Sequence, residues 1–343
     1  MTTAISPETM NKPVAVIILN WNGQEMLSRF LPEVVKTTDN NIADIIVADN
    51  GSTDGSLQLI AEKFPEVKTI RLDRNYGFAE GYNRAIAMTE YRYTVLLNSD
   101  VATSQGWVNS LFDYMESHPE TGAVQPKIRS VDHPDSFEYA GASGGYIDCN
   151  GYPYCRGRIF DNVETDHGQY DDVAKVFWAS GAALMVRSSL YEKAGGLDAD
   201  FFAHMEEIDL CWRIQLAGYN IEVVPQSIVY HLGGGTLPAS NPRKTYLNFR
   251  NNLLLLHKNL PDSCRRKRLF IRRLYDTLAW AKFIVSLDFK NASAILRAHR
   301  DFRKMAQAYT THPDKNLLPS KPDIIFDYFL RRRSTFSQLK QDS

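Results

Sequence analysis

Five carboxylates in this sequence stand where they could take part in chemistry. Asp49 and Asp100 come at or just after the ends of short apolar runs, and Glu206, Glu207 and Asp209 stand close together. A carboxylate at the end of a strand can accept a hydrogen bond from a nucleotide base, or bind a hard divalent cation such as Mg²⁺ or Mn²⁺. A half-buried carboxylate can have a raised pKa and act as a general base. Turn, capping and solvent-exposed roles fit the same residue types.

Two further polar groups could complete a metal site. Asn98 and Ser99 precede Asp100, so amide and carboxylate oxygens stand together after one apolar run. His231 closes another apolar run just before the glycines at 233–235. Glycines allow a ligand to approach the backbone closely, and an imidazole at a strand end can bind a metal. A structural histidine is the more common alternative.

The elements expected around these residues alternate between strand and helix. Apolar runs rich in β-branched residues predict strands, and amphipathic periodicity predicts helices between them. The expected strands are 14–19, 44–49, 67–72 and 93–97, and the expected helices are 24–38, 56–64 and 80–89. This order is typical of a doubly wound, mostly parallel α/β sheet. Ligands bind beyond the carboxyl ends of such strands, so the polar loops 20–23, 49–55 and 98–100 should converge.

The rest of the chain has weaker patterns. The further expected elements are a helix at 107–117, a strand at 123–128, a loop or hairpin at 139–158, strands at 176–178 and 182–186, a helix at 201–216, strands at 221–224 and 228–231, and long helices from 241 to about 309.

Composition excludes several classes of protein. The 343 residues are 44% hydrophobic and 23% charged, with net charge −1, as in ordinary globular proteins. Four cysteines without a CxxC pair indicate free thiols rather than a disulfide framework or a zinc cluster. The first 13 residues lack the apolar core of a secretory signal, and no stretch has the ~18–20 uncharged apolar residues of a spanning helix. These features favour a cytoplasmic protein.

The charge is unevenly distributed. Residues 243–343 hold 22 basic and 8 acidic residues, whereas residues 1–242 hold 17 basic and 32 acidic ones. The acidic part argues against nucleic acid as a partner. Basic clusters at 265–268 and 272–273 adjoin an aromatic-rich apolar stretch that ends near 287. That pattern fits a helix on an anionic membrane surface, at the inner face of the cytoplasmic membrane, and equally a helical appendage whose charges are solvated.

Taken together, five segments resemble one known family. They are residues 16–22, 49–56, 75–79 with Asn83, 97–100 and 206–213. In this order and spacing the chain resembles the inverting glycosyltransferases of family two, which have the GT-A fold. Within the family it is most similar to rhamnosyltransferase-type enzymes of bacterial surface-polysaccharide assembly. The resemblance covers roughly residues 12 to 260. It implies a GT-A domain at 12–242, followed by a basic helical region at 243–343.

The resemblance also implies roles for individual residues. Asp49 matches the position that binds the nucleotide base, and Asp100 matches the main ligand of a divalent metal, Mg²⁺ or Mn²⁺. Glu207 matches the usual catalytic base. The nucleotide-binding set would be Asn20, Asn22, Asp49, Asn75, Gly77, Asn83, Asn98, Ser99 and Arg250. The metal set would be Asp100, Asn98 and His231, and the acceptor side would include Trp178 and Gly181.

Two positions depart from the family pattern. The metal motif begins with Asn98 instead of Asp, which removes one negative ligand. The expected base is Glu207 instead of Asp, so Glu206 and Asp209 stay open as alternatives.

The implied reaction is a metal-assisted single displacement. A sugar, with rhamnose as one candidate, would pass from a nucleotide-diphosphate donor to a glycan or lipid-linked acceptor. One alternative is a sugar-phosphate nucleotidyltransferase, which needs a glycine-rich, basic first loop that residues 20–23 lack. Another alternative is a non-catalytic relative that only binds nucleotide sugar. The presence of Asp49, Asp100 and Glu207 argues against it.

Overall fold

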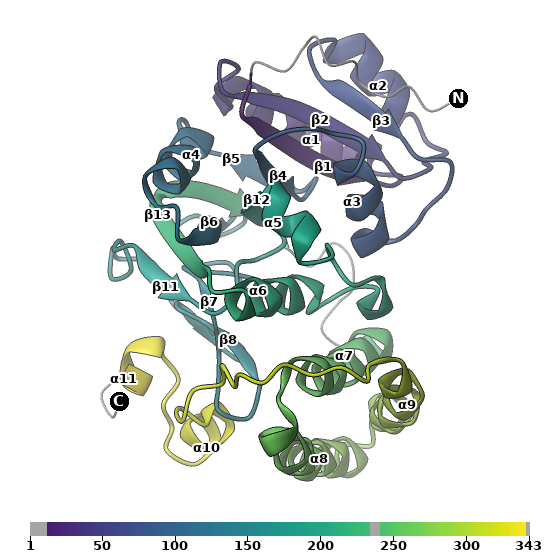
Figure 1. The fold of residues 1–343 in the computed structure, drawn as a ribbon, viewed down its shortest axis with the longest axis vertical. Coiled ribbons are helices and arrows are strands. Elements are labelled where there is room, and N and C mark those ends of the chain that lie inside the picture. Colours follow the sequence, from purple (N-terminus) through teal and green to yellow (C-terminus); the bar gives the residue numbers. More distant parts are fainter. Residues whose placement is uncertain (1–11, 234–240, 341–343) are drawn as a thin grey trace.

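A nine-stranded mixed sheet forms the centre of the computed structural model, which describes residues 12–233 and 241–340 (Figure 1). The strand order is β11-β13-β6-β12-β4-β1-β2-β3, and β5 also pairs with β13. Helices cover the sheet, and a helical C-terminal part lies beyond α6. The predicted α/β architecture is therefore confirmed.

The first half of the sheet is parallel, as predicted. Its elements are β1 (Val14–Asn20), α1 (Gln24–Thr37), β2 (Ala43–Asp49), α2 (Ser56–Lys63), β3 (Lys68–Arg71), α3 (Phe78–Ile86) and β4 (Tyr93–Leu97). Along β1, Ile17 packs into one apolar layer, while Val16 and Ile18 pack into the other. Because both faces of the sheet are covered, the central strands are continuous apolar runs.

The second half of the sheet is mixed. Its elements are β5 (Val101–Thr103), α4 (Trp107–Ser117), β6 (Thr121–Ser130), β11 (Ala174–Val176), β12 (Ala183–Arg187), α5 (Ser188–Lys193), the 3₁₀ turn η2 (Ala199–Phe201), α6 (Glu206–Leu216) and β13 (Asn220–His231). Strand β12 lies antiparallel between β4 and β6. The prediction of two strands at 221–224 and 228–231 was wrong. They form one strand, because β13 continues through a register shift between Val224 and Ile228.

A small antiparallel sheet occupies the expected loop or hairpin at 139–158 and the residues just after it. Its strands are β7 (Gly145–Ile147), β8 (Pro153–Cys155), β9 (Arg158–Ile159) and β10 (Asn162–Val163). Trp178 covers Gly145, where an added Cβ would lie 2.1 Å from the indole ring. The absence of a side chain at Gly145 therefore makes room for this tryptophan.

Helix α6 begins five residues later than the sequence predicted. Phe202, His204 and Met205 have positive φ values of 65°, 70° and 74°, which a helix does not allow. The Asn251 amide fixes this loop by donating hydrogen bonds to the carbonyls of Phe201, Ala203 and His204, at 2.9, 2.8 and 2.7 Å. A contact from a distant helix thus overrides the local helical pattern.

The C-terminal part is helical, as predicted. Its elements are α7 (Pro242–Asn259), α8 (Asp262–Val285), α9 (Phe289–Met305), the 3₁₀ turn η3 (Ala306–Ala308), α10 (Ile324–Phe329) and α11 (Phe336–Lys340). Helix α7 packs against α6, α8 and α9, and its leucines 253–256 are buried. Within the described ranges, no helix has the length and apolarity needed to cross a membrane. The four cysteines are free thiols.

Candidate active site

The carboxyl ends of β1 and β2 are joined by a polar cluster, as the sequence predicted. The Asn20 amide donates hydrogen bonds to Asp49 Oδ1 and Ser52 Oγ, at 3.1 and 3.2 Å. Asp49 Oδ2 accepts a hydrogen bond from the Ser52 backbone N–H at 3.0 Å, and Ser52 Oγ accepts one from the Asn22 N–H at 2.9 Å. Asp49 is only 2% exposed. Asn20, Asn22 and Asp49 therefore form one preorganised group.

Asn50 connects this cluster to the segment before α3. Its amide donates hydrogen bonds to Asn75 Oδ1 at 3.1 Å and to the Gly77 carbonyl at 3.0 Å. Asn50 Oδ1 accepts a hydrogen bond from the Tyr76 N–H at 2.9 Å. Asn75 and Gly77 thus lie beside the first two loops, as expected. Asn50 was not among the predicted site residues, although its place beside Asp49 in the same turn was a usable signal.

A second cluster forms where β4 and β13 end. Asp100 Oδ1 lies 3.2 Å from His231 Nε2, and the Asn98 amide nitrogen lies 3.4 Å from the same atom. Glu138 Oε2 lies 3.4 Å from His231 Nδ1 on the other side of the ring. Ser99 lies between Asn98 and Asp100 in the turn. The structure thus joins the predicted metal residues and adds Glu138, which had no recognisable signal in its loop.

In this second cluster, His231 and Asp100 each stabilise the charged form of the other. Burial favours a neutral His231, but hydrogen bonds and charge from Asp100 and Glu138 outweigh it and raise the His231 pKa to about 10. Burial likewise acts to raise the Asp100 pKa, yet the hydrogen bond and charge of His231 lower it below the usual value. Asp100 is therefore held as a carboxylate.

The donor set of this cluster suits a divalent cation that is shared with phosphates. Within residues 12–233 and 241–340, no group of three or more His, Cys, Asp or Glu side chains is arranged to hold a metal by itself. Asp100 Oδ1 and His231 Nε2 converge, however, so a bound cation would take the place of the His231 Nε2 proton, and Asn98 adds an amide next to them. Mg²⁺ commonly takes one or two carboxylates and completes its shell with substrate phosphates and water. These residues fit that pattern.

Glu206 is buried and Glu207 is half-buried at the start of α6. The Oε2 atoms of both are buried without a hydrogen-bond partner in the described part of the chain. Burial, followed by the charge of Glu207, raises the pKa of Glu206 well above its ordinary value. Burial raises the pKa of Glu207 to about 7. Burial thus favours the neutral form of both carboxyl groups, and Glu207 has an oxygen available to accept a proton.

Gly181 connects the α6 carboxylates to the end of β4. A Cβ on Gly181 would lie 3.7 Å from the Glu207 Cβ, which is ordinary contact. The next residue, Ala182, accepts a hydrogen bond from the Asn98 N–H at 3.0 Å. Since β4 is also paired with β1, this segment places Glu207 at the same edge of the sheet as the two polar clusters.

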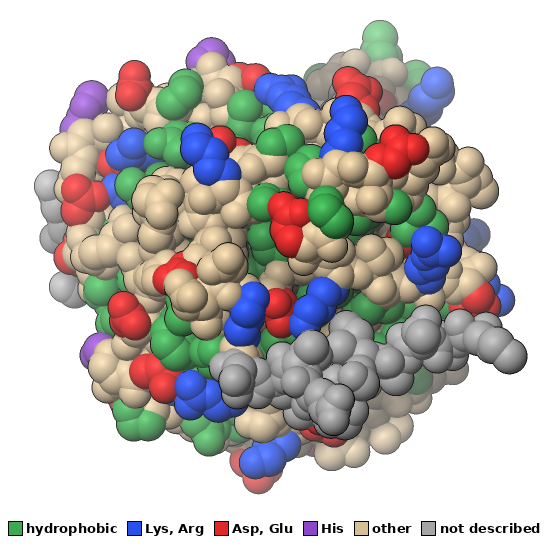
Figure 2. All heavy atoms as spheres, turned by 90° about the horizontal axis from the view of Figure 1, so that it is seen from above, with side chains coloured by type: hydrophobic (Ala, Val, Ile, Leu, Met, Phe, Trp, Pro, Cys, Tyr) green, Lys and Arg blue, Asp and Glu red, His purple; other side chains and the backbone are tan. Residues whose placement is uncertain are grey.

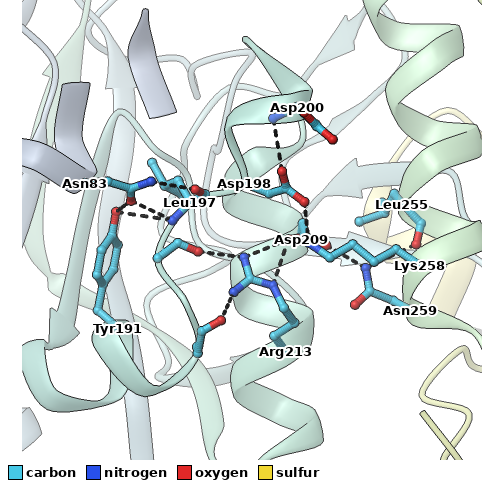
Figure 3. Close-up of polar contacts among 12 residues, drawn as sticks. Asn83, Tyr191, Leu197, Asp198, Asp200, Asp209, Arg213, Leu255, Lys258 and Asn259 are labelled. Atoms are coloured by element: carbon cyan, nitrogen blue, oxygen red, sulfur yellow. Dashed lines mark hydrogen bonds and ion pairs between the residues drawn. The ribbon is translucent and has the colours of Figure 1, made fainter. Parts of the chain in front are cut away.

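Asp209 is fully occupied by an ion network (Figure 3). Its carboxylate contacts Arg213 Nε at 2.8 Å, Lys258 Nζ at 2.9 Å and the Asn259 amide at 2.7 Å, and it is completely buried. Lys258 also contacts Asp198, at 2.6 Å. The network ties α7 to α6, so the geometry favours a structural role for Asp209 over the role of base.

Asn83 also lies within a structural network. Its Oδ1 accepts hydrogen bonds from Tyr191 Oη at 2.6 Å and the Leu197 N–H at 2.9 Å, and its amide donates to the Leu197 carbonyl at 2.8 Å (Figure 3). The structure therefore directs this side chain to the turn before η2 and not to the polar clusters.

Arg250 and Trp178 are engaged elsewhere as well. The Arg250 guanidinium donates hydrogen bonds to the carbonyls of Asp200 and Phe201, at 2.9 and 2.8 Å. The Trp178 indole is 3% exposed and donates a hydrogen bond to the Tyr146 carbonyl at 2.9 Å. Both side chains support the surroundings of the site. Their predicted direct contacts with donor and acceptor stay predictions.

A cavity of about 580 Å³ lies elsewhere in the molecule, between the β7–β8 hairpin and the C-terminal segment. Tyr146, Lys175, Phe177 and Phe336 are among its lining residues, and none of the predicted site residues lines it. Its volume alone therefore does not identify the site at the strand ends.

Comparison with known proteins agrees with this fold and site. Residues 15–190 match the family model described as glycosyl transferase family 2, which is more than half of the chain. The chain belongs to glycosyl transferase family 2. It is 27% identical over 236 residues to the N-acetylglucosaminyl-diphospho-decaprenol L-rhamnosyltransferase of Mycobacterium tuberculosis, covering 65% of this chain and 76% of that protein. It is 22% identical to the low-salt glycan biosynthesis hexosyltransferase Agl10 of Haloferax volcanii, over 72% of this chain and 76% of that protein.

Solved structures of glycosyltransferases share the fold. Staphylococcus aureus TarS residues 1–349, in complex with UDP-GlcNAc, match with a TM-score of 0.57 at 14% identity, covering 86% of this chain and 83% of that one. The mannosyltransferase PcManGT of Pyrobaculum calidifontis, with GDP-Man and Mn²⁺, matches with a TM-score of 0.52 at 14% identity, covering 88% and 85%. The predicted GT-A fold is confirmed, and the protein is a nucleotide-sugar-dependent glycosyltransferase.

Proposed function

We propose that this protein transfers a sugar with inversion from a nucleotide-diphosphate donor to a glycan or lipid-linked acceptor, with Glu207 as the base. One observation carries the proposal. Glu207 has a buried Oε2 without a hydrogen-bond partner, and its Cβ lies beside Gly181, whose neighbour Ala182 accepts a hydrogen bond from the Asn98 N–H at the donor edge. A buried base next to the bound donor is the arrangement that a direct displacement needs.

The donor would bind along the first polar cluster. Asp49 is fixed by Asn20 and Ser52, and can accept a hydrogen bond from the N–H of a nucleotide base. Asn22, Asn75 and Gly77 lie in the adjoining loops. Preorganised polar groups lower the cost of ordering a ligand, because their positions are set before it binds.

Asp100, His231 and Asn98 would hold Mg²⁺ or Mn²⁺. A divalent cation there offsets the negative charge that develops on a departing nucleotide diphosphate. The archaeal mannosyltransferase with the same fold contains Mn²⁺ together with GDP-Man, which supports the proposal. Glu138 would orient the His231 ring through Nδ1, as carboxylates commonly do for metal-binding histidines.

In the chemical step the donor and the acceptor supply the reacting atoms, and this chain supplies the group that accepts the proton. The acceptor hydroxyl attacks the anomeric carbon from the face opposite the diphosphate, while Glu207 accepts the hydroxyl proton. Such a base contributes ~10²–10⁴-fold in rate. Burial and the charge of Glu207 raise the pKa of Glu206, so the two carboxyl groups resist carrying charge together. One displacement inverts the anomeric centre without a covalent intermediate.

A rhamnose donor and a lipid-linked acceptor are the first combination to test. They are suggested by the name of the mycobacterial relative, an N-acetylglucosaminyl-diphospho-decaprenol L-rhamnosyltransferase. The names of the relatives and the family membership favour sugar transfer over the nucleotidyltransferase alternative. The intact Asp49, Asp100 and Glu207 favour it over a non-catalytic relative.

Titration calorimetry and a transfer assay test the proposal together. Wild-type protein is titrated with a nucleotide-diphosphate rhamnose, UDP-GlcNAc and GDP-Man, with and without Mn²⁺. We expect one donor to bind in a metal-dependent way, and its sugar to be transferred to an N-acetylglucosaminyl-diphospho-prenol. Glu207→Gln should bind that donor normally and fail to transfer. Donor binding without metal, or transfer by Glu207→Gln at the wild-type rate, would contradict the mechanism.

A further inference from the structure

Exposed large apolar side chains gather in one part of the molecule. Fifteen such residues are exposed in the described chain, and ten of them lie between Phe270 and Leu330. These ten are Phe270, Leu274, Leu278, Val285, Leu287, Phe289, Leu296, Phe326, Phe329 and Leu330. Scattered apolar residues need no explanation, but a concentration of this kind indicates an interaction surface.

Helix α8 presents a continuous apolar stripe. Phe270, Leu274 and Leu278 are spaced by four residues, so they lie on one face of the helix. Their side chains are 61%, 52% and 65% exposed. The opposite face is buried, with Leu269 and Arg272 packed inward. The stripe is therefore not the face that attaches α8 to the protein.

The apolar surface continues around the turn into α9. Val285 and Leu287 are 83% and 73% exposed, and Phe289 and Leu296 are 59% and 58% exposed. Leu287 has a φ of 59°, a left-handed conformation that costs energy for a leucine. Val285 and Leu287, the two most exposed large apolar residues among those described, thus stand at the tip of a helical hairpin.

Basic groups outnumber acidic ones around this stripe, although Asp262 at the start of α8 and Asp288 just beyond its end are charged too. Arg266, Lys267 and Arg273 on α8 are exposed. Asp276 is 1% exposed and is paired with Arg272 and His299 inside the structure. The surface around the apolar stripe is therefore positive.

Helix α10 and the residues after it place a second group of exposed apolar and basic side chains at the same end of the molecule (Figure 1). Phe329 and Leu330 are 50% and 69% exposed and are followed directly by Arg331 and Arg332, which are exposed too. The opposite end, viewed in Figure 2, differs, because acidic, basic and apolar side chains are interspersed there. Two segments far apart in the sequence therefore contribute apolar and basic groups at one end.

We infer that the outer faces of α8, the α8–α9 turn and α10 form a docking surface for an anionic lipid bilayer. Exposed apolar side chains accompanied by Lys and Arg are complementary to acyl chains below acidic headgroups. None of the described helices could span a bilayer, so the contact would be interfacial. The inference does not depend on the proposed reaction, although a surface of this kind would hold the enzyme where a lipid-linked acceptor lies.

Vesicle flotation tests the inference with the full-length protein. The probes are vesicles of phosphatidylcholine with 30% phosphatidylglycerol, and vesicles of phosphatidylcholine alone. Two triple variants change the surface, F270S/L274S/L278S and R266A/K267A/R273A. The control R29A/K36A/K63A removes the same charge from exposed positions on α1 and α2 at the other end. Thermal unfolding of each variant checks that it is folded.

We expect the wild type and the control to float with anionic vesicles at low salt and not with neutral ones. Each basic residue near an anionic surface contributes about fivefold to partitioning, so the basic triple variant should bind on the order of a hundredfold more weakly. The apolar triple variant should also lose binding. Wild-type protein that stays unbound, or equal losses in the control and the basic variant, would overturn the inference. Glu207→Gln should float like the wild type, which separates this test from that of the reaction.

Discussion

Replacing Glu207 by Gln isolates the step on which the proposed reaction depends. Gln has nearly the same shape as Glu but cannot accept a proton. The Oε2 atom of Glu207 is buried without a partner, so the change breaks no hydrogen bond at that atom. It also removes a charge that raises the pKa of Glu206. The variant should therefore fold as the wild type does, and its unfolding temperature should not fall.

The pH dependence follows from the Glu207 pKa of about 7. Burial disfavours the charged carboxylate, so the group is protonated, and useless as a base, below that pH. Half of the molecules hold an ionised Glu207 at about pH 7, and about a tenth at pH 6. The rate of transfer should rise with pH through this range and then level off. The nearby Cys211 does not interfere, because burial raises its pKa to about 12.

The assay measures kcat/KM for sugar transfer from pH 5.5 to 9, at saturating Mn²⁺. Wild-type activity should fall about tenfold per pH unit below the pKa, and Glu207→Gln should lose ~10²–10⁴-fold with a flat profile. A variant that retains the wild-type slope would refute the assignment of Glu207.

Asp209→Asn is the matched comparison for Glu207→Gln. The change removes the charge that balances Arg213 and Lys258, which contact the Asp209 carboxylate. Breaking a buried ion pair from one side costs about 3–5 kcal/mol. We therefore expect Asp209→Asn to lower the free energy of unfolding, in contrast to Glu207→Gln. Chemical denaturation of both variants measures this difference, and equal stabilities would speak against the structural role of Asp209.

Three other changes test separate parts of the site. Asp100→Ala should abolish transfer and Mn²⁺-dependent donor binding while circular dichroism stays unchanged; metal-dependent binding that persists would argue against Asp100 as a ligand. Asn251→Ala removes the two N–H donors that serve three carbonyls of the loop before α6, at about 1 kcal/mol per donor, so denaturant unfolding should show a loss of about 2 kcal/mol together with a lower kcat. Gly145→Ala places a Cβ 2.1 Å from the Trp178 ring and should destabilise by about 1–3 kcal/mol, whereas Gly181→Ala has space at 3.6 Å and should melt like the wild type.

Local patterns predicted most of the sheet and its connecting helices. The expected helix at 107–117 coincides with α4 (Trp107–Ser117), and the strand expected at 93–97 coincides with β4. These elements could be predicted because apolar periodicity is a property of consecutive residues. The start of α6 could not be predicted in this way, because Asn251 determines it from about 50 positions away.

Some of the site residues could likewise be predicted from the sequence, and others could not. Asp49, Asn98 and Asp100 follow the ends of strands, and strand ends in a parallel sheet share one edge, so their convergence followed from topology. Glu138 and Lys258 could not be found, because each acts through a partner far away in the chain, His231 and Asp209. Choosing among Glu206, Glu207 and Asp209 needed the hydrogen-bond partners, which only coordinates provide.

Because the position of α6 depends on α7, donor binding and sugar transfer depend on different parts of the chain. The polar clusters that would bind the nucleotide belong to residues before α7, but the backbone in front of Glu206 is held by the Asn251 amide, and Asp209 is held by Lys258. A protein shortened before residue 242 could retain the donor loops and lose the alignment of its base. Because leucines 253–256 of α7 are buried in the core, such a truncation would also expose apolar surface, so engineering of acceptor choice in this chain has to keep α7 and the sheet together.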